Sequence, residues 1–85
     1  MPIIYITNNK HRADLKVYKE ERSKYSADML YYETDNKNRA KKDCIWYFTD
    51  NKHRADKKIF WEKNKHRADL KVYEVSNKNH AKGSF

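Results

Sequence analysis

The stretch Asn-Lys-His-Arg-Ala-Asp-Leu-Lys-Val-Tyr stands at residues 9–18 and recurs without change at residues 64–73. A close copy, Asn-Lys-His-Arg-Ala-Asp-Lys-Lys-Ile-Phe, occupies residues 51–60. Internal repeats reveal the architecture of a chain, and overlooking them leads to the wrong fold. We therefore take this stretch as the unit from which the fold is built.

The alanine of the unit returns along the whole chain and gives the period of the repeat. The intervals between successive alanines are 14, 13, 15, 13 and 13 residues, for Ala13, Ala27, Ala40, Ala55, Ala68 and Ala81. Such a period is too short for the common helical repeats, which need about 33–47 residues, and suits one strand plus one turn. We predict a single domain, residues 1–85, with units near 3–8, 9–22, 23–35, 36–50, 51–63, 64–76 and 77–82.

The second half of each unit has the pattern of a strand. In residues 68–73, small and aliphatic side chains alternate with charged and aromatic ones, which is a period of two. The sequence therefore predicts an all-β fold, a small single domain of about six short strands. The expected strands are near residues 3–8, 13–20, 27–34, 44–48, 59–61 and 70–75. We expect the alanine, leucine and valine positions to face inward and the apolar run 44–48 to be central. Parallel and antiparallel pairing both remain open.

The turns must rely on asparagine, because glycine and proline occur only once each. Asparagine tolerates left-handed backbone, and its side chain bonds to nearby main-chain groups. We predict that turns open at Asn9, Asn36, Asn51, Asn64 and Asn77. The insertion at 41–43 predicts a bulge or a longer loop. Residues 83–85 fall outside the repeat and are expected to be disordered or extraneous.

The repeated Ala-Asp pair resembles the septoil-knot domain, a bacterial family of unknown function built from short Ala-Asp-x-x-Val-Tyr strand repeats. The pair occurs at residues 13–14, 27–28, 55–56 and 68–69, and becomes Ala-Lys at 40–41 and 81–82. The resemblance covers residues 3–82 and implies a small all-β fold that is deeply knotted, as a seven-crossing torus knot. Chains generally avoid knots, so the knot is implied by the resemblance alone. The family supplies no functional residues.

The composition is strongly basic. The chain has 85 residues, with 20 Lys and Arg against 12 Asp and Glu, and a formal net charge of +8. A mean hydropathy of −1.29 leans towards disorder, but the aromatic residues follow the repeat and favour a folded chain. Such a charge suits a polyanion such as nucleic acid, and a merely solvating surface is the alternative. The candidate contacts are the turn residues Lys10, Arg12, Arg39, Arg54 and Arg67.

The sequence predicts no catalytic, cofactor-binding or metal-binding site. Cys44 lies in an apolar run, where a free cysteine is usually inert packing. The three histidines His11, His53 and His66 hold equivalent positions and could meet at a zinc ion. They recur because the unit recurs, however, so we predict no metal site.

Two further patterns each have two interpretations. Trp46 and Trp61 could stack on bases, although strand positions favour packing in the core. Arg and Asp flank three of the alanines, at residues 12 and 14, 54 and 56, and 67 and 69. These aspartates could accept hydrogen bonds from Arg or His of the next unit, or they could be solvated charges.

The sequence does not identify a biochemical function. The expectation is a small non-enzymatic domain, an interaction module without a cofactor. The alternatives are weak, sequence-independent nucleic-acid binding through the basic turns and a metal-dependent enzyme that uses the histidines. A signal peptide has a basic region followed by an apolar run, and the start of the chain lacks this pattern. No stretch approaches the roughly 20 apolar residues of a membrane span. We therefore expect a cytoplasmic monomer with no membrane partner.

Overall fold

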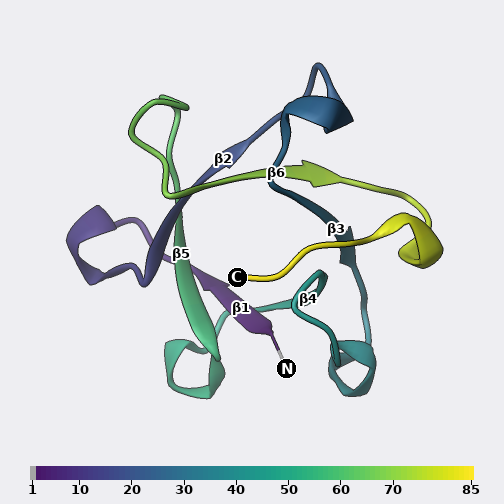
Figure 1. The fold of residues 1–85 in the computed structure, drawn as a ribbon. Helices are drawn as coiled ribbons and strands as arrows, with labels where there is room; N and C mark the ends of the chain where they lie inside the picture. The colour runs from purple at the N-terminus through teal and green to yellow at the C-terminus, as the bar shows by residue number, and fades with distance from the viewer. Residues whose placement is uncertain (1) are drawn as a thin grey trace.

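In a computed structural model, which describes residues 2–85, the chain forms six strands, and short 3₁₀ turns follow all of them except the fifth, which an ordinary turn connects to the sixth (Figure 1). The strands are β1 (Ile3–Ile6), β2 (Leu15–Lys19), β3 (Met29–Glu33), β4 (Ile45–Thr49), β5 (Lys57–Trp61) and β6 (Leu70–Glu74). The 3₁₀ turns are η1 (Lys10–Arg12), η2 (Lys24–Ser26), η3 (Lys37–Arg39), η4 (Lys52–Arg54) and η5 (Lys78–His80). The all-β prediction is confirmed, with each strand boundary within two residues of its expected position. Within residues 2–85, no helix is long and apolar enough to cross a membrane.

All neighbouring strands run parallel and close into a barrel in the order β1-β4-β3-β6-β2-β5. Strands that follow one another in sequence do not pair, except β3 and β4, where Tyr32 lies opposite Ile45. Parallel strands cannot be joined by a tight hairpin, so the chain leaves the barrel after each strand and re-enters elsewhere. In a closed barrel every strand has two neighbours, so the expectation of a central strand at 44–48 is wrong.

The molecule is a flat disc of 32 × 31 × 16 Å. Figure 1 shows the turns projecting outward from the ring of strands, while the C-terminal end of the chain runs back into the ring. The strands therefore supply the body of the disc and the turns supply its rim.

One position of the repeat supplies the core. It lies directly before the aromatic residue that recurs in each unit. Its occupants are all 0–2% exposed: Ile4, Val17, Tyr31, Trp46, Ile59 and Val72. Tyr31 and Trp46, the two largest of these side chains, stack with ring centroids 4.1 Å apart and planes inclined by 16°. Leu15 and Leu70 are half-buried against this cluster. The inward face predicted for the valine and leucine positions is thus where the core forms.

Each turn is closed by its own side chains. At η1, Thr7 Oγ1 accepts from the Asn9 N–H at 3.2 Å, and Asn9 Oδ1 accepts from the His11 N–H at 2.9 Å. The Asn9 carbonyl then accepts from the Arg12 N–H at 3.0 Å. Within the part of the chain that the structure describes, no residue other than glycine has a positive φ. The expectation that asparagine side chains bond to nearby main-chain groups is confirmed. The left-handed backbone also expected for them is wrong, because Asn9 precedes the 3₁₀ turn with an extended backbone, at φ −112° and ψ 107°.

The aspartate after the alanine connects strands that are distant in sequence. The Asp14 N–H donates to the Lys58 carbonyl at 2.7 Å, and Asp14 Oδ2 accepts from the Lys58 N–H at 2.8 Å. The same two-way pairing joins Asp28 to Lys71, Asp56 to Ile3 and Asp69 to Lys16. The hypothesis that these aspartates accept from Arg or His is wrong. Each carboxylate lies at the entry to a strand, where it continues the hydrogen-bond ladder of the neighbouring strand.

Residues 83–85 continue the repeat. Phe85 holds the position after Ala81 that Val72 holds after Ala68, and its ring is stacked on Trp46 with centroids 5.8 Å apart. The Phe85 N–H donates to Asp43 Oδ2 at 3.3 Å. Gly83 has a φ of +112°, and an added Cβ would lie 3.1 Å from Met29 Cγ. The expectation that this segment is disordered or extraneous is wrong, because the segment packs against the core as a seventh, shorter unit.

Candidate nucleic-acid interface

The barrel order brings the three Lys-His-Arg loops side by side. Because β5, β1 and β4 are neighbours, the loops that follow them occupy consecutive places on the rim. Figure 1 shows them together on one side of the disc, in green, purple and teal. We define the basic rim as the exposed residues Lys10, His11, Arg12, Lys52, His53, Arg54, Lys65, His66 and Arg67. Segments from distant parts of the chain, residues 10–12 and 65–67 among them, thus lie on consecutive loops.

The sequence-predicted polyanion contacts lie on neighbouring loops of the disc. Lys10, Arg12, Arg54 and Arg67 belong to the basic rim, and Arg39 lies in η3. Since β3 follows β4 in the barrel, η3 is the next loop after η4. The five residues therefore occupy four consecutive loops, while η5 and η2 complete the circle on the far side. The sequence alone does not show this adjacency, which follows from the order of the strands in the barrel.

A groove of about 570 Å³ separates η1 from η4. Tyr5 lines it and lies directly opposite Thr49 of β4 and Lys58 of β5 in the sheet register. The remaining lining residues are Thr7, Asn8, Asn9, Arg12, Lys52, His53 and Lys58, with no carboxylate among them. The groove therefore combines one aromatic ring with cationic side chains from two loops and a strand.

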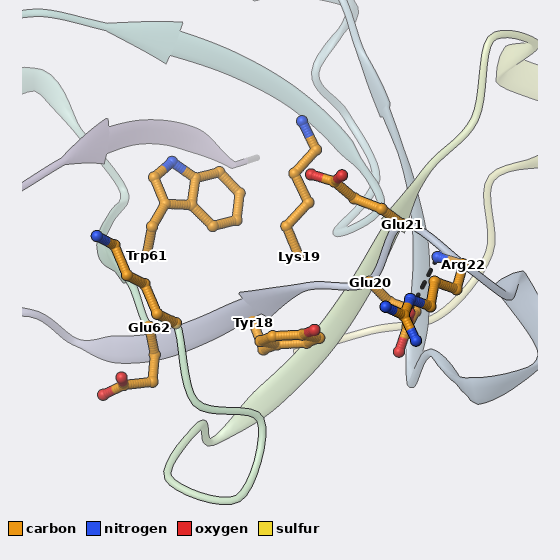
Figure 2. Close-up of a pocket in the computed structure, with 8 residues that line it drawn as sticks. Tyr18, Lys19, Glu20, Glu21, Arg22, Trp61 and Glu62 are labelled. Carbon is orange, nitrogen blue, oxygen red and sulfur yellow. Dashed lines mark hydrogen bonds between the residues drawn. The ribbon is translucent and has the colours of Figure 1, made fainter.

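Elsewhere on the rim the grooves include carboxylates. The groove in Figure 2, of about 560 Å³, is lined by Tyr18 and Trp61 together with Glu20, Glu21 and Glu62, as well as Lys19, Arg22 and Lys63. A dashed line in Figure 2 marks the hydrogen bond in which Glu20 Oε1 accepts from the Arg22 N–H at 3.0 Å. These opposite charges largely offset one another. This groove should therefore attract a polyanion much less strongly than the groove between η1 and η4.

The two tryptophans have different surroundings. Trp46 is fully buried, and its Nε1–H donates to the Asp43 carbonyl at 2.7 Å, so it is part of the core. Trp61 is half-buried and lines the groove of Figure 2. The interpretation as core packing therefore holds for Trp46, whereas Trp61 also faces a groove.

The histidines and the cysteine show no arrangement for metal chemistry. Among residues 2–85, no group of three His, Cys, Asp or Glu side chains could hold a metal ion. His11, His53 and His66 lie on three separate loops. Cys44 is a free thiol that is 4% exposed within the core.

A closed barrel of parallel strands, made from a repeat of one strand and one asparagine-opened turn, defines a class of small β-repeat proteins with interlaced strands. The chain belongs to the 7(1) septoil knot domain family, which it matches over residues 1–83. No curated protein and no solved structure matches this sequence. The match to the family over residues 1–83 confirms the resemblance drawn from the Ala-Asp repeats.

Proposed function

We propose that this domain is a non-enzymatic interaction module that binds nucleic acid without sequence preference, through the basic rim. The observation that carries the proposal is the placement of three Lys-His-Arg loops in consecutive positions on the disc. Lys and Arg that contact phosphates release counterions and supply most of the affinity in sequence-independent binding. Six such side chains lie on these adjacent loops. Of the exposed carboxylates beside them, those of Asp14, Asp56 and Asp69 accept hydrogen bonds from main-chain N–H groups of neighbouring strands.

The geometry of the rim favours contacts with phosphates over contacts with base edges. Base readout uses an α-helix or a two-stranded ribbon that enters the major groove of duplex DNA. The rim instead presents turns of three residues, such as η1 and η4. Phosphate contacts position a protein on nucleic acid but carry no sequence information, which is why we propose binding that is indifferent to sequence.

The proposal includes a cytoplasmic, monomeric protein of bacterial origin, with no membrane partner. Free cysteines are kept reduced in the cytosol, and the buried Cys44 thiol is compatible with that environment. Nucleic acid is an abundant polyanion in the same compartment.

A second candidate is a protein-binding module that uses the groove of Figure 2. Aromatic residues are enriched at protein interfaces, and this groove presents Tyr18 and Trp61 beside side chains of both charges. A protein partner would then be retained at salt concentrations that release nucleic acid.

The test is the salt dependence of binding to a duplex of arbitrary sequence. About four to six phosphate contacts give a slope of about −4 to −5 in log K against log salt concentration. The double variant Arg12→Glu with Arg67→Glu should flatten this slope by about two. A matched double variant on the far side, Lys24→Glu with Lys78→Glu, makes the same change in charge on η2 and η5 and should keep the slope.

Two results would overturn the proposal. One is the absence of binding to any nucleic acid at about 50 mM salt, where electrostatic binding is strong. The other is an equal loss of slope in both double variants, which would mean that overall charge, and not the basic rim, determines binding.

A further inference from the structure

We propose that the groove between η1 and η4 holds one nucleotide of a single strand, with the base stacked on Tyr5 and the phosphate bound by Arg12, Lys52 and Lys58. This inference rests on the proposed function and specifies its ligand: single-stranded nucleic acid should bind more tightly than duplex.

Tyr5 is held as a fixed platform. Its neighbour Ile4 is 0% exposed in the core, so the alternation of a strand directs Tyr5 to the outer face. Thr49 and Lys58 flank it in the register on either side, and the ring is half-buried. Proteins that bind single strands without sequence preference combine such aromatic rings with a basic groove, because every base has a π-face.

The cationic residues that line this groove with Tyr5 come from three elements. Arg12 comes from η1, Lys52 from η4 and Lys58 from β5, and His53 of η4 lines the groove as well. The arginine guanidinium can bind two phosphate oxygens at once, whereas lysine acts as a point charge. Asp14 lies close by in sequence to η1, but its Oδ2 accepts from the Lys58 N–H at 2.8 Å. The volume of about 570 Å³ falls within the range of about 300–1,000 Å³ typical of small-ligand sites.

At the equivalent positions that line other grooves, carboxylates join the lining. The groove at Tyr32 has three cationic residues, Arg39, Lys41 and Lys78, but also Asp35. Tyr73 occupies the same repeat position as Tyr5, but its groove is lined by Glu20, Glu21 and Glu74 as well as Lys19. Lys19 there forms an ion pair with Glu74 at 3.4 Å. Tyr73 therefore provides a matched control, with the same aromatic residue at the same repeat position but with acidic surroundings.

A duplex cannot use the Tyr5 platform in the same way, because its bases are stacked on one another inside the helix. A single strand can turn one base onto the ring while its phosphates contact the cations. Stacking of one base typically changes affinity by about 5- to 150-fold. The preference for a single strand should therefore depend on Tyr5, whereas binding to duplex should not.

The experiment measures the affinities of oligothymidine and of a duplex of equal length at about 50 mM salt, where electrostatic binding is strong. Tyr5→Leu keeps an apolar side chain and removes the ring; it should weaken single-strand binding by about 5- to 150-fold and leave duplex binding unchanged. Tyr5→Phe should restore wild-type affinity, and Tyr73→Leu should bind both ligands as the wild type does. Far-UV circular dichroism checks that each variant is folded.

A measurement on the wild type avoids any dependence on variants. Addition of oligothymidine should shift the ring-proton NMR resonances of Tyr5 and leave those of Tyr73 in place. Unshifted Tyr5 resonances in the presence of bound oligothymidine would overturn the inference. So would a Tyr5→Leu protein that is folded and either keeps its single-strand affinity or loses affinity for both ligands equally. These outcomes leave the proposed function standing, whereas a wild type that binds neither ligand would reject both.

Discussion

At the scale of single residues, the aspartates show how one side chain can fix the register between two strands. Asp69 binds Lys16 in both directions: its N–H donates to the carbonyl at 2.7 Å, and its Oδ2 accepts from the N–H at 2.9 Å. A hydrogen bond to a charged group contributes about 1.5–3 kcal/mol, and exposure to solvent reduces this. We expect Asp69→Ala to lower the free energy of unfolding by about 1–2 kcal/mol, measured by urea denaturation.

The control for this prediction is Asp50→Ala, which removes an exposed carboxylate beside η4. Exposed substitutions away from special contacts usually change stability by less than about 0.5 kcal/mol. If the two variants were equally unstable, loss of negative charge from a basic protein, and not loss of the strand connection, would explain the effect.

Tyr31 should make the stability of the domain sensitive to alkaline pH. Its burial raises the pKa of the hydroxyl above the ordinary range, and Glu74 and Glu33 raise it further. In the unfolded chain a tyrosine ionises near pH 10. The stabilisation from neutral Tyr31 is therefore complete below about pH 10 and is lost as the pH rises towards the folded-state pKa, because the unfolded state releases its proton first.

The measurement for Tyr31 is the urea midpoint between about pH 8 and pH 11, a range that spans the ordinary tyrosine pKa. Tyr31→Phe should lose about 1 kcal/mol less stability over this range than the wild type does. A parallel decline in both proteins would show that other groups cause the alkaline sensitivity.

At the scale of elements, the 13-residue period predicted where the strands lie because each unit carries the same alternation of side chains. It predicted the start of a seventh unit at residues 77–82 but not that residues 83–85 continue this unit, since Gly83-Ser84-Phe85 does not follow the repeat pattern. What identifies Phe85 is its spacing from Ala81, which places it at the core position, and its stacking on Trp46 at 5.8 Å. The structure also explains the glycine at residue 83, because a φ of +112° is unfavourable for residues other than glycine.

The seventh unit leads to a prediction about Phe85. Phe85→Ala removes the contact with Trp46 and leaves Lys57, whose Nζ lies 5.5 Å from the Phe85 ring centroid, without its aromatic partner. Replacing a fully buried phenylalanine by alanine lowers the free energy of unfolding by about 3–5 kcal/mol. Because Phe85 is 37% exposed, we expect a smaller loss of about 1–3 kcal/mol, together with a change in Trp46 fluorescence.

Tyr25→Ala is the control for Phe85→Ala. Tyr25 is 88% exposed, so its removal should change stability by less than about 0.5 kcal/mol. If Phe85→Ala had the stability and fluorescence of the wild type, the C-terminal residues would not contribute to the core.

At the scale of the whole molecule, the candidate site depends on strand order, which the repeat cannot encode. Residues 9–18 and 64–73 are identical in sequence, yet one enters η1 and β2 while the other leads into β6, and β2 pairs with β6. Any unit could pair with any other by pattern alone. The differences that distinguish the units are the bulky Tyr31 and Trp46 at core positions and the insertion at 41–43. The sequence therefore predicted the basic turns but not that three of them lie together.

The last prediction concerns folding, because every strand pair other than β3 with β4 joins distant parts of the chain. Asp56, for example, accepts from the Ile3 N–H, 53 residues away. Domains dominated by non-local contacts fold in milliseconds to seconds, whereas helical bundles fold in microseconds to milliseconds. The threading implied by the septoil-knot family should slow folding further. We expect refolding from urea to take seconds or longer, with slow unfolding that gives kinetic stability.

Stopped-flow fluorescence of the two tryptophans can follow both reactions. Proline isomerisation is the usual origin of slow phases, and the chain has a single proline, Pro2. Pro2→Ala should therefore keep the slow phase if assembly of the barrel limits the rate. Loss of the slow phase in Pro2→Ala would assign it to the Met1–Pro2 bond. Complete refolding of the wild type in under about 1 ms, the range of helical bundles, would contradict a threaded chain whose strands pair across such long separations.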